Sequence, residues 1–124
     1  MNDSSVSVAK IAKILDLKNF TDNIDLKKIK ITSSDVNRPA LQLTGYFAHF
    51  EQSRIQMIGN VEYAYIQQMN DEEKRIRYNA FLQFEIPCVI FCRDLQPDAI
   101  FIEQAEKNHV PILGTGRPTS EFMA

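Results

Sequence analysis

The sequence of 124 residues lacks features that several classes of protein require. Its net charge of −2 provides no basic surface of the kind that nucleic acids or acidic membranes attract. No apolar run approaches the roughly 20 residues that a membrane-spanning helix needs. The first ten residues, MNDSSVSVAK, have neither the basic nor the apolar region of a signal peptide. These absences predict a cytoplasmic protein with no nucleic-acid partner and no membrane partner.

The motif of a P-loop phosphoryl-transfer enzyme is also absent. That motif, G-x-x-x-x-G-K-[ST], holds nucleotide phosphates with backbone amides and a lysine. The sequence has only four glycines, and none of them is followed by lysine. We therefore expect no catalytic residue and no cofactor-binding residue in this chain.

Cysteine and histidine are scarce as well. Cys88 and Cys92 both lie in the strand-like run PCVIFCR. Four residues along a strand place them on one face but about 13 Å apart, which is too far for a disulfide or a shared metal ion. His49 and His109 have no partner residue at the spacing of a catalytic pair or a metal site. We predict buried, reduced thiols and no metal site.

Segments with helical and strand-like patterns alternate along the chain. Strand-like runs cover residues 26–32, 54–59, 86–93 and 110–115, whereas helix signals begin at Ser5 or Ser7, Asn60, Asn70 and Pro97. Residues 16–23 are interpreted as a connector. The run 86–93 is almost entirely apolar, which is typical of a strand buried on both faces. The pattern predicts an α/β fold with a mostly parallel sheet flanked by helices.

Two sets of side chains are assigned from these patterns. The adjacent central strands should contain Val89, Ile90, Phe91, Ile112 and Leu113. In the helix after Asn70, the buried stripe should be Ile76, Ala80, Phe81 and Phe84, and the solvated face should hold Lys74, Arg75 and Arg77.

The most distinctive stretch covers residues 31–59, ITSSDVNRPALQLTGYFAHFEQSRIQMIG. Pro39 fixes its own φ and favours an extended Arg38, so Asn37, Arg38 and Pro39 should form an ordered, partly exposed turn. Gly45 precedes bulky aromatic residues, which indicates a positive φ or a close backbone approach. The side chains expected to pack inward from this turn are those of Leu41, Leu43 and Phe47.

This stretch resembles the N-terminal domain of bacterial HPr kinase/phosphorylase. The family pattern is D-x-N-R-P-G-L-x-L-x-G-Y-F, followed by R-I-Q-L-x-G-x-x-E. The matching positions are Asp35, Asn37, Arg38, Pro39, Leu41, Leu43, Gly45, Tyr46, Phe47, Arg54, Ile55, Gln56, Gly59 and Glu62. Ala40 stands where the pattern has glycine, and Met57 where it has leucine. The resemblance covers nearly the whole chain and includes the later segments Pro87-Cys88 and Thr119-Ser120, so residues 1–124 are interpreted as one such domain.

The resemblance implies a non-catalytic regulatory or assembly domain. Enzymes of this family phosphorylate a serine of the phosphocarrier HPr with ATP and Mg²⁺, reverse the reaction by phosphorolysis, and control carbon catabolite repression. They form homohexamers, and their P-loop lies in a C-terminal domain that this chain lacks. Residues 119–122 look like the start of a helix with no end, which also suggests a piece of a longer protein.

A small-ligand binding module is the alternative. At fold level the family's N-terminal domain resembles the nucleotide-sugar-binding domain of the Mur peptidoglycan ligases, which suggests a phosphosugar or a nucleotide as the ligand. Such fold-level analogy is weak evidence for function.

Two arginines and one loop are the candidate interaction or ligand residues. Arginine suits bidentate contact with a carboxylate or a phosphate. Arg38 and Arg54 could therefore contact a partner, or could pair internally with Asp35 and Glu62. The internal pair is favoured for Arg54, and both possibilities stay open for Arg38. If the turn at Arg38 contacts another part of a longer protein, Arg38→Ala should change the stability of this domain by no more than about 0.5 kcal/mol.

The loop after residue 113 contains two glycines, Arg117, and the hydroxyl groups of Thr115 and Ser120. It precedes a helix start, where backbone amides can bind an anion. Pro118 removes one of those amides, and the loop has no lysine, so an ordinary capped turn is the favoured interpretation. The full candidate set is Asn37, Arg38, Arg54, Thr115, Arg117 and Ser120.

Overall fold

The computed structural model of this chain describes residues 5–121. Its elements, in chain order, are β1 (Val6–Ser7), α1 (Val8–Ile14), β2 (Lys18–Asn19), the 3₁₀ turn η1 (Leu26–Lys28), β3 (Lys30–Ile31), β4 (Val36–Asn37), α2 (Ala40–Leu43), β5 (Ile55–Ile58), α3 (Asn60–Gln67), α4 (Asp71–Leu82), β6 (Val89–Phe91), α5 (Ala99–Lys107), β7 (Ile112–Gly114) and the 3₁₀ turn η2 (Thr119–Glu121). The expected alternation of helices and strands is confirmed.

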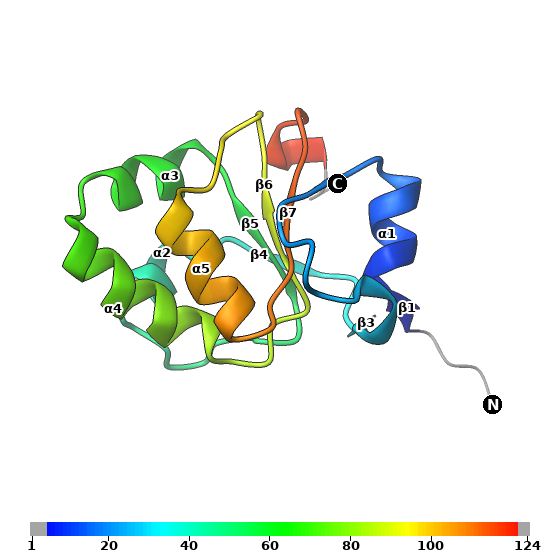
Figure 1. The fold of residues 1–124 in the computed structure, drawn as a ribbon, viewed down its shortest axis with the longest axis horizontal. Coiled ribbons are helices and arrows are strands. Elements are labelled where there is room, and N and C mark those ends of the chain that lie inside the picture. Colours follow the sequence, from blue (N-terminus) through cyan, green and yellow to red (C-terminus); the bar gives the residue numbers. More distant parts are fainter. Residues whose placement is uncertain (1–4, 122–124) are drawn as a thin grey trace.

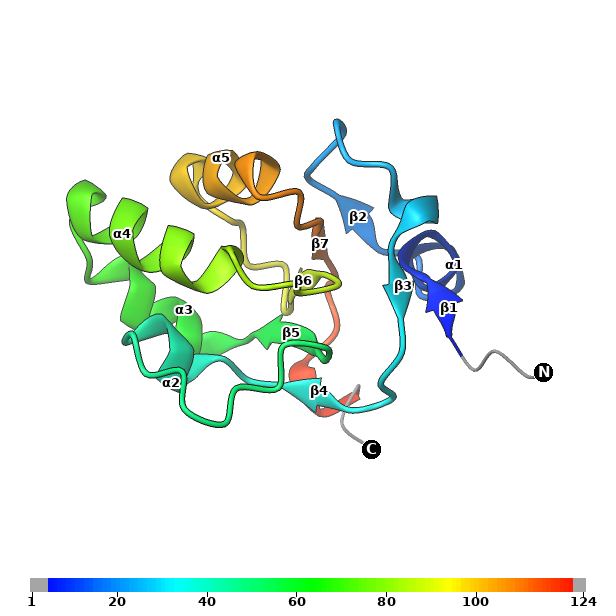
Figure 2. The ribbon, with the colours of Figure 1, turned by 90° about the horizontal axis from the view of Figure 1, so that it is seen from below.

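The main sheet has the strand order β2-β7-β6-β5-β4. Strands β4 to β7 are parallel and lie side by side in chain order, and β2 adds an antiparallel edge. Helices α2, α3, α4 and α5 cover one face, while α1 and a two-stranded ribbon of β1 and β3 cover the other (Figures 1 and 2). The mostly parallel sheet flanked by helices is therefore confirmed.

The central strands are buried on both faces, as their apolar sequence predicts. In β6, Val89 and Phe91 pack with the α2–α5 layer, whereas Ile90 packs with the α1 layer. Ile90 lies beside Met57 of β5 and Leu113 of β7. Cys88 and Cys92 share the face of Ile90, and both are free and buried. Burial raises the thiol pKa to about 12 for Cys88 and to about 11 for Cys92.

The short strands at the edges differ from the sequence-based expectation. The strand predicted at residues 26–32 is a 3₁₀ turn followed by two strand residues, and these pair with β1 instead of joining the main sheet. The connector predicted at 16–23 contains β2, which pairs with β7. The turn predicted at 37–39 is wrong for Asn37, which lies in β4 and pairs with β5. Two-residue strands are too short to show a period-two pattern, so their pairing depends on the tertiary fold.

The side chains of α4 also differ in part from the prediction. Asn70 caps the helix, since its side chain accepts from the amide of Glu73 at 2.8 Å, but Ile76 is 60% exposed. Lys74, expected on the solvated face, lies 3.2 Å from the carboxylate of Asp98 with only 13% of its side chain exposed. That carboxylate also caps α5 and accepts from the hydroxyl of the buried Tyr78 at 2.8 Å. The buried side of α4 is the one that carries Tyr78, Phe81 and Leu82, and Lys74 lies beside it against Asp98.

Ile90 tests the assignment of the core. Ile90→Asp places an unpaired charge at a fully buried position between two strands, so it should cost several kcal/mol and unfold the domain. Thermal melting followed by circular dichroism measures the loss. Ile76→Asp, at an exposed position, is the matched control and should melt close to the wild type. An Ile90→Asp protein with an unchanged melting temperature would refute the assignment.

Candidate functional site

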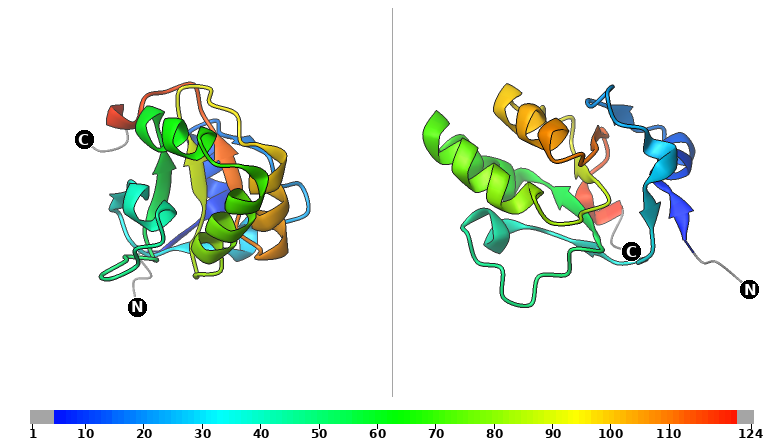
Figure 3. Two further views of the ribbon diagram at one scale, coloured as in Figure 1. Left: turned by 90° about the vertical axis from the view of Figure 1, so that its left-hand side faces the viewer. Right: turned by 60° about the horizontal axis from the view of Figure 1, so that its bottom comes forward.

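The segments that follow β4, β5 and β7 lie close together at one end of the sheet, where α3 begins. Arg38 follows β4, Glu62 lies in the first turn of α3 after β5, and Thr119 lies in η2 after β7. These are the carboxyl ends of parallel strands, where α/β proteins commonly bind ligands. Figure 3 shows η2 outside the α2–α5 layer at this end of the sheet. The candidate site is therefore the cluster of Arg38, Gly59, Glu62 and Thr119.

An ion pair between a half-buried arginine and a buried carboxylate forms the centre of this cluster. Arg38 Nη2 lies 2.8 Å from Glu62 Oε1, and Arg38 Nε lies 3.1 Å from both carboxylate oxygens. The Glu62 side chain is only 3% exposed, and that of Arg38 is 31% exposed. The amide of Gly59 also donates to Glu62 Oε1, at 2.7 Å. A buried carboxylate needs such a cation and such donors, because its burial is otherwise very costly.

The absence of a side chain at Gly59 allows Arg38 and Thr119 to approach each other. It is the residue that caps α3, one position before the predicted Asn60. A Cβ on this residue would lie 2.8 Å from Arg38 Nη2 and 3.0 Å from Thr119 Cγ2. Arg38 Nη1 also donates to Thr119 Oγ1, at 3.3 Å. Glycine at this position therefore leaves the space in which the arginine and the threonine meet.

Both arginines make internal pairs with the acids that the sequence offers. Arg38 pairs with Glu62, which settles its internal partner, whereas Arg54 lies 3.8 Å from an exposed Asp35. The exposed pair contributes little to stability. Asn37 donates to Gln56 Oε1 at 2.7 Å and so connects β4 with β5. Asn37 and Arg38 thus connect elements of the fold, whereas Arg54 contributes little, and a change at Arg38 should cost more than the 0.5 kcal/mol expected of a surface residue.

The side chains that follow Pro39 only partly match the prediction. Leu43 is buried, and the ring of Phe47 packs at 4.8 Å from that of Phe84, so these two point inward as expected. Leu41 is 60% exposed, so the prediction is wrong for this residue. The single turn of α2 can bury only one of its sides. Gly45 has the expected positive φ, 96°.

Thr115 and Arg117, two of the candidate residues, make contacts inside the loop after β7. Thr115 Oγ1 accepts from the amide of Arg117 at 3.2 Å, and Arg117 Nε lies 3.7 Å from Glu121. Ser120 is exposed in η2, and the predicted continuation of a helix to Phe122 lies outside the described residues. The structure brings Thr119 to Arg38, and sequence reasoning missed Thr119 as a site residue. Its signals in the sequence were its place as a possible cap of the turn and the resemblance of the Thr119-Ser120 segment to the family.

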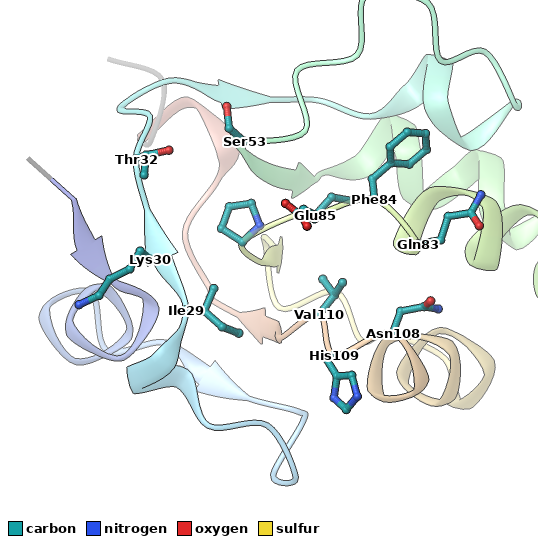
Figure 4. Close-up of a pocket in the computed structure, with 12 residues that line it drawn as sticks. Ile29, Lys30, Thr32, Ser53, Gln83, Phe84, Glu85, Asn108, His109 and Val110 are labelled. Atoms are coloured by element: carbon teal, nitrogen blue, oxygen red, sulfur yellow. The ribbon is translucent and has the colours of Figure 1, made fainter.

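Two pockets lie apart from the ion pair. A pocket of about 170 Å³ borders the loop after β7, and its lining includes Lys18, Asp94 and Thr115. A larger pocket of about 440 Å³ includes Lys30, Glu85, Pro87, His109 and Val110, and none of the candidate residues lines it. Figure 4 shows that His109 points away from the other labelled side chains. His109 therefore does not converge with the other labelled groups of this pocket.

Residues 5–121 contain neither a cluster of metal ligands nor a membrane-spanning helix. In that part of the chain, no three His, Cys, Asp or Glu side chains are grouped so that they could hold a metal ion. The same residues include no helix that is both long and apolar enough to cross a membrane.

Comparisons with known proteins give a consistent assignment. The sequence model of the family described as "HPr Serine kinase N terminus" matches residues 6–124. The HPr kinase/phosphorylase of Lachnoclostridium phytofermentans is 43% identical over 120 residues, which are 97% of this chain and 39% of that protein. That of Caldicellulosiruptor bescii is 38% identical over 117 residues, which are 94% of this chain and 38% of that protein. The chain thus spans about two fifths of the length of these curated relatives.

A solved structure has a similar fold. It contains the CBS and DRTGG domains of the regulatory region of a Clostridium perfringens pyrophosphatase, in complex with the activator diadenosine tetraphosphate. The TM-score is 0.62 at 17% identity, and the match covers 94% of this chain and 44% of that chain. At this identity the likeness concerns the fold alone. On the strength of the family match and the curated relatives, the chain belongs to the HPr serine kinase N-terminus family.

Proposed function

We propose that this chain is the non-catalytic N-terminal domain of a longer HPr kinase/phosphorylase and that it serves the assembly or regulation of that enzyme. The observation that carries the proposal is the family match over residues 6–124, combined with the 39% share of the first curated relative that the chain spans. The sequence itself has no P-loop, because none of its glycines precedes a lysine.

The proposed whole enzyme phosphorylates a serine of HPr with ATP and Mg²⁺ and reverses this by phosphorolysis. It acts in the cytoplasm as a homohexamer and controls carbon catabolite repression. Its ATP and Mg²⁺ would be held by the portion of the enzyme that this chain does not include. HPr and the other subunits are therefore its proposed partners.

The pairing of charges supports a non-catalytic role. Arg38, Arg54 and Arg117 each face an acidic side chain of the same chain. A phosphoryl-transfer site would instead need cationic groups that are free to hold the phosphate. The nearest hydroxyl, that of Thr119, accepts from Arg38 and has no base hydrogen-bonded to it within the described residues.

A small-ligand module remains the second candidate, because a pocket of about 170 Å³ borders Thr115 at the carboxyl end of β7. We propose on this alternative that the fold is related to the nucleotide-sugar-binding domain of the Mur ligases. The ligand would then be a phosphosugar or a nucleotide.

The isolated chain should transfer no phosphate from ATP to purified HPr, because it lacks the P-loop lysine and glycines that hold the nucleotide.

A chimera in which residues 1–124 replace the matching part of the Lachnoclostridium phytofermentans enzyme should phosphorylate HPr. The same enzyme without this part should change its oligomeric state or its regulation. Transfer of radiolabelled phosphate measures the phosphorylation of HPr, and light scattering measures the oligomeric state. Phosphate transfer by the isolated chain would contradict the proposal.

A thermal-shift screen separates the two candidates, since a ligand bound only by the native state raises apparent stability. With phosphosugars and nucleotides at 100 times a dissociation constant, the expected gain for a binding module is about 2.7 kcal/mol. For an assembly domain we expect no shift with any of them. Gly116→Asp, which places a carboxylate beside Asp94 at the pocket, is the control that should abolish a genuine shift.

A further inference from the structure

The chain after β7 is bound to the domain in two different ways. Up to Arg117, backbone hydrogen bonds hold it to the end of β6. The amide of Asp94 donates to the carbonyl of Thr115, and the amide of Arg93 donates to the carbonyl of Arg117, both at 2.9 Å. After Pro118, η2 makes local contacts, which are the 3.2 Å bond from the Glu121 amide to the Pro118 carbonyl and the pairing of Glu121 with Arg117.

Within residues 5–121, one hydrogen bond connects η2 to a distant part of the chain. It runs from Arg38 Nη1 to Thr119 Oγ1 at 3.3 Å and joins residues that are 81 positions apart. Thr119 is buried, with 8% exposure, and its methyl group lies against Gly59. The position of η2 therefore depends on Arg38 and on the space that Gly59 leaves.

Arg38 is oriented independently of Thr119. Glu62 accepts from Nε and Nη2 of the guanidinium, and these contacts direct Nη1 toward η2 without any contribution from Thr119. When the bond to Thr119 breaks, Arg38 keeps its contacts with Glu62. A single bond at 3.3 Å can therefore open without breaking the buried ion pair.

We propose that Arg38 is a latch that holds η2 against the domain. In the longer enzyme, it sets the direction in which the chain leaves this domain and hence the position of the domain relative to the remainder. This inference rests on the proposed function, because an orienting role requires the longer protein. Closing the latch fixes the two parts relative to each other, and opening it lets them move.

Thr119→Val tests the latch in the isolated chain, because it removes the hydroxyl and keeps the branched shape. Ser120→Ala is the matched control, since it removes an exposed hydroxyl from the same turn. Hydrogen exchange should become at least about tenfold faster at the Glu121 amide in Thr119→Val, as expected for losing a hydrogen bond to a charged group. The amides of β5, β6 and α3 should exchange as in the wild type, as should every amide of Ser120→Ala.

Arg38→Lys separates the latch from the ion pair. Lysine keeps a positive charge near Glu62 but lacks the fork that reaches two partners at once. The Glu121 amide should again exchange faster, now with some loss of thermal stability. Unchanged exchange at residues 119–121 in both variants would overturn the latch, whatever the domain does in a longer enzyme.

The orienting role is tested in the chimera with the Lachnoclostridium phytofermentans enzyme. Small-angle scattering should give a larger radius of gyration for Thr119→Val than for wild type, and no change for Ser120→Ala. Faster exchange in η2 with unchanged scattering would overturn the orienting role. If instead an enzyme without this domain assembles and is regulated normally, the proposed function fails, while the exchange result on the isolated chain still decides the latch.

Discussion

The buried carboxylate of Glu62 is the constraint on which this end of the structure depends. With its side chain 3% exposed, it must keep a cation and hydrogen-bond donors close at hand. Arg38 supplies the cation and the Gly59 amide supplies a donor, so the end of β4 and the start of α3 are held together. The same guanidinium reaches Thr119, which extends the connection to the chain after β7. One acidic group thus organises three connections of the sheet.

The sequence predicted the parts of the fold whose signal is local. The apolar run at 86–93 and the capped start of α4 at Asn70 are each encoded by residues that are neighbours in the sequence. Both were predicted and are confirmed. The strands β1 and β2 have two residues each, so no periodicity could show them. Ile76 fits an apolar stripe by spacing, but the side of α4 that is buried in the structure carries Tyr78, Phe81 and Leu82.

The candidate site was predictable only as a set of alternatives. The sequence offered Glu62 as a partner for Arg38, but the two are 24 positions apart, and their meeting requires β4 and β5 to lie side by side. Thr119 is 81 positions from Arg38 and gave no periodic or compositional signal. The internal pairing explains why residues of the family pattern can matter in a domain proposed to have no catalytic role: they fix its connections. The proposed latch would also fix the position of this domain relative to the rest of the enzyme.

A double-mutant cycle on Arg38 and Glu62 tests the central role of the ion pair most directly. Urea unfolding of Arg38→Ala, Glu62→Ala and the double variant gives the three free energies. Arg38→Ala leaves the buried carboxylate without its partner and should cost about 3 kcal/mol, whereas Glu62→Ala should cost less because the Arg38 side chain is 31% exposed. The double variant should cost about 2 kcal/mol less than the sum of the two. Single changes within about 0.5 kcal/mol of wild type, adding without coupling, would show that the carboxylate of Glu62 does not organise this fold.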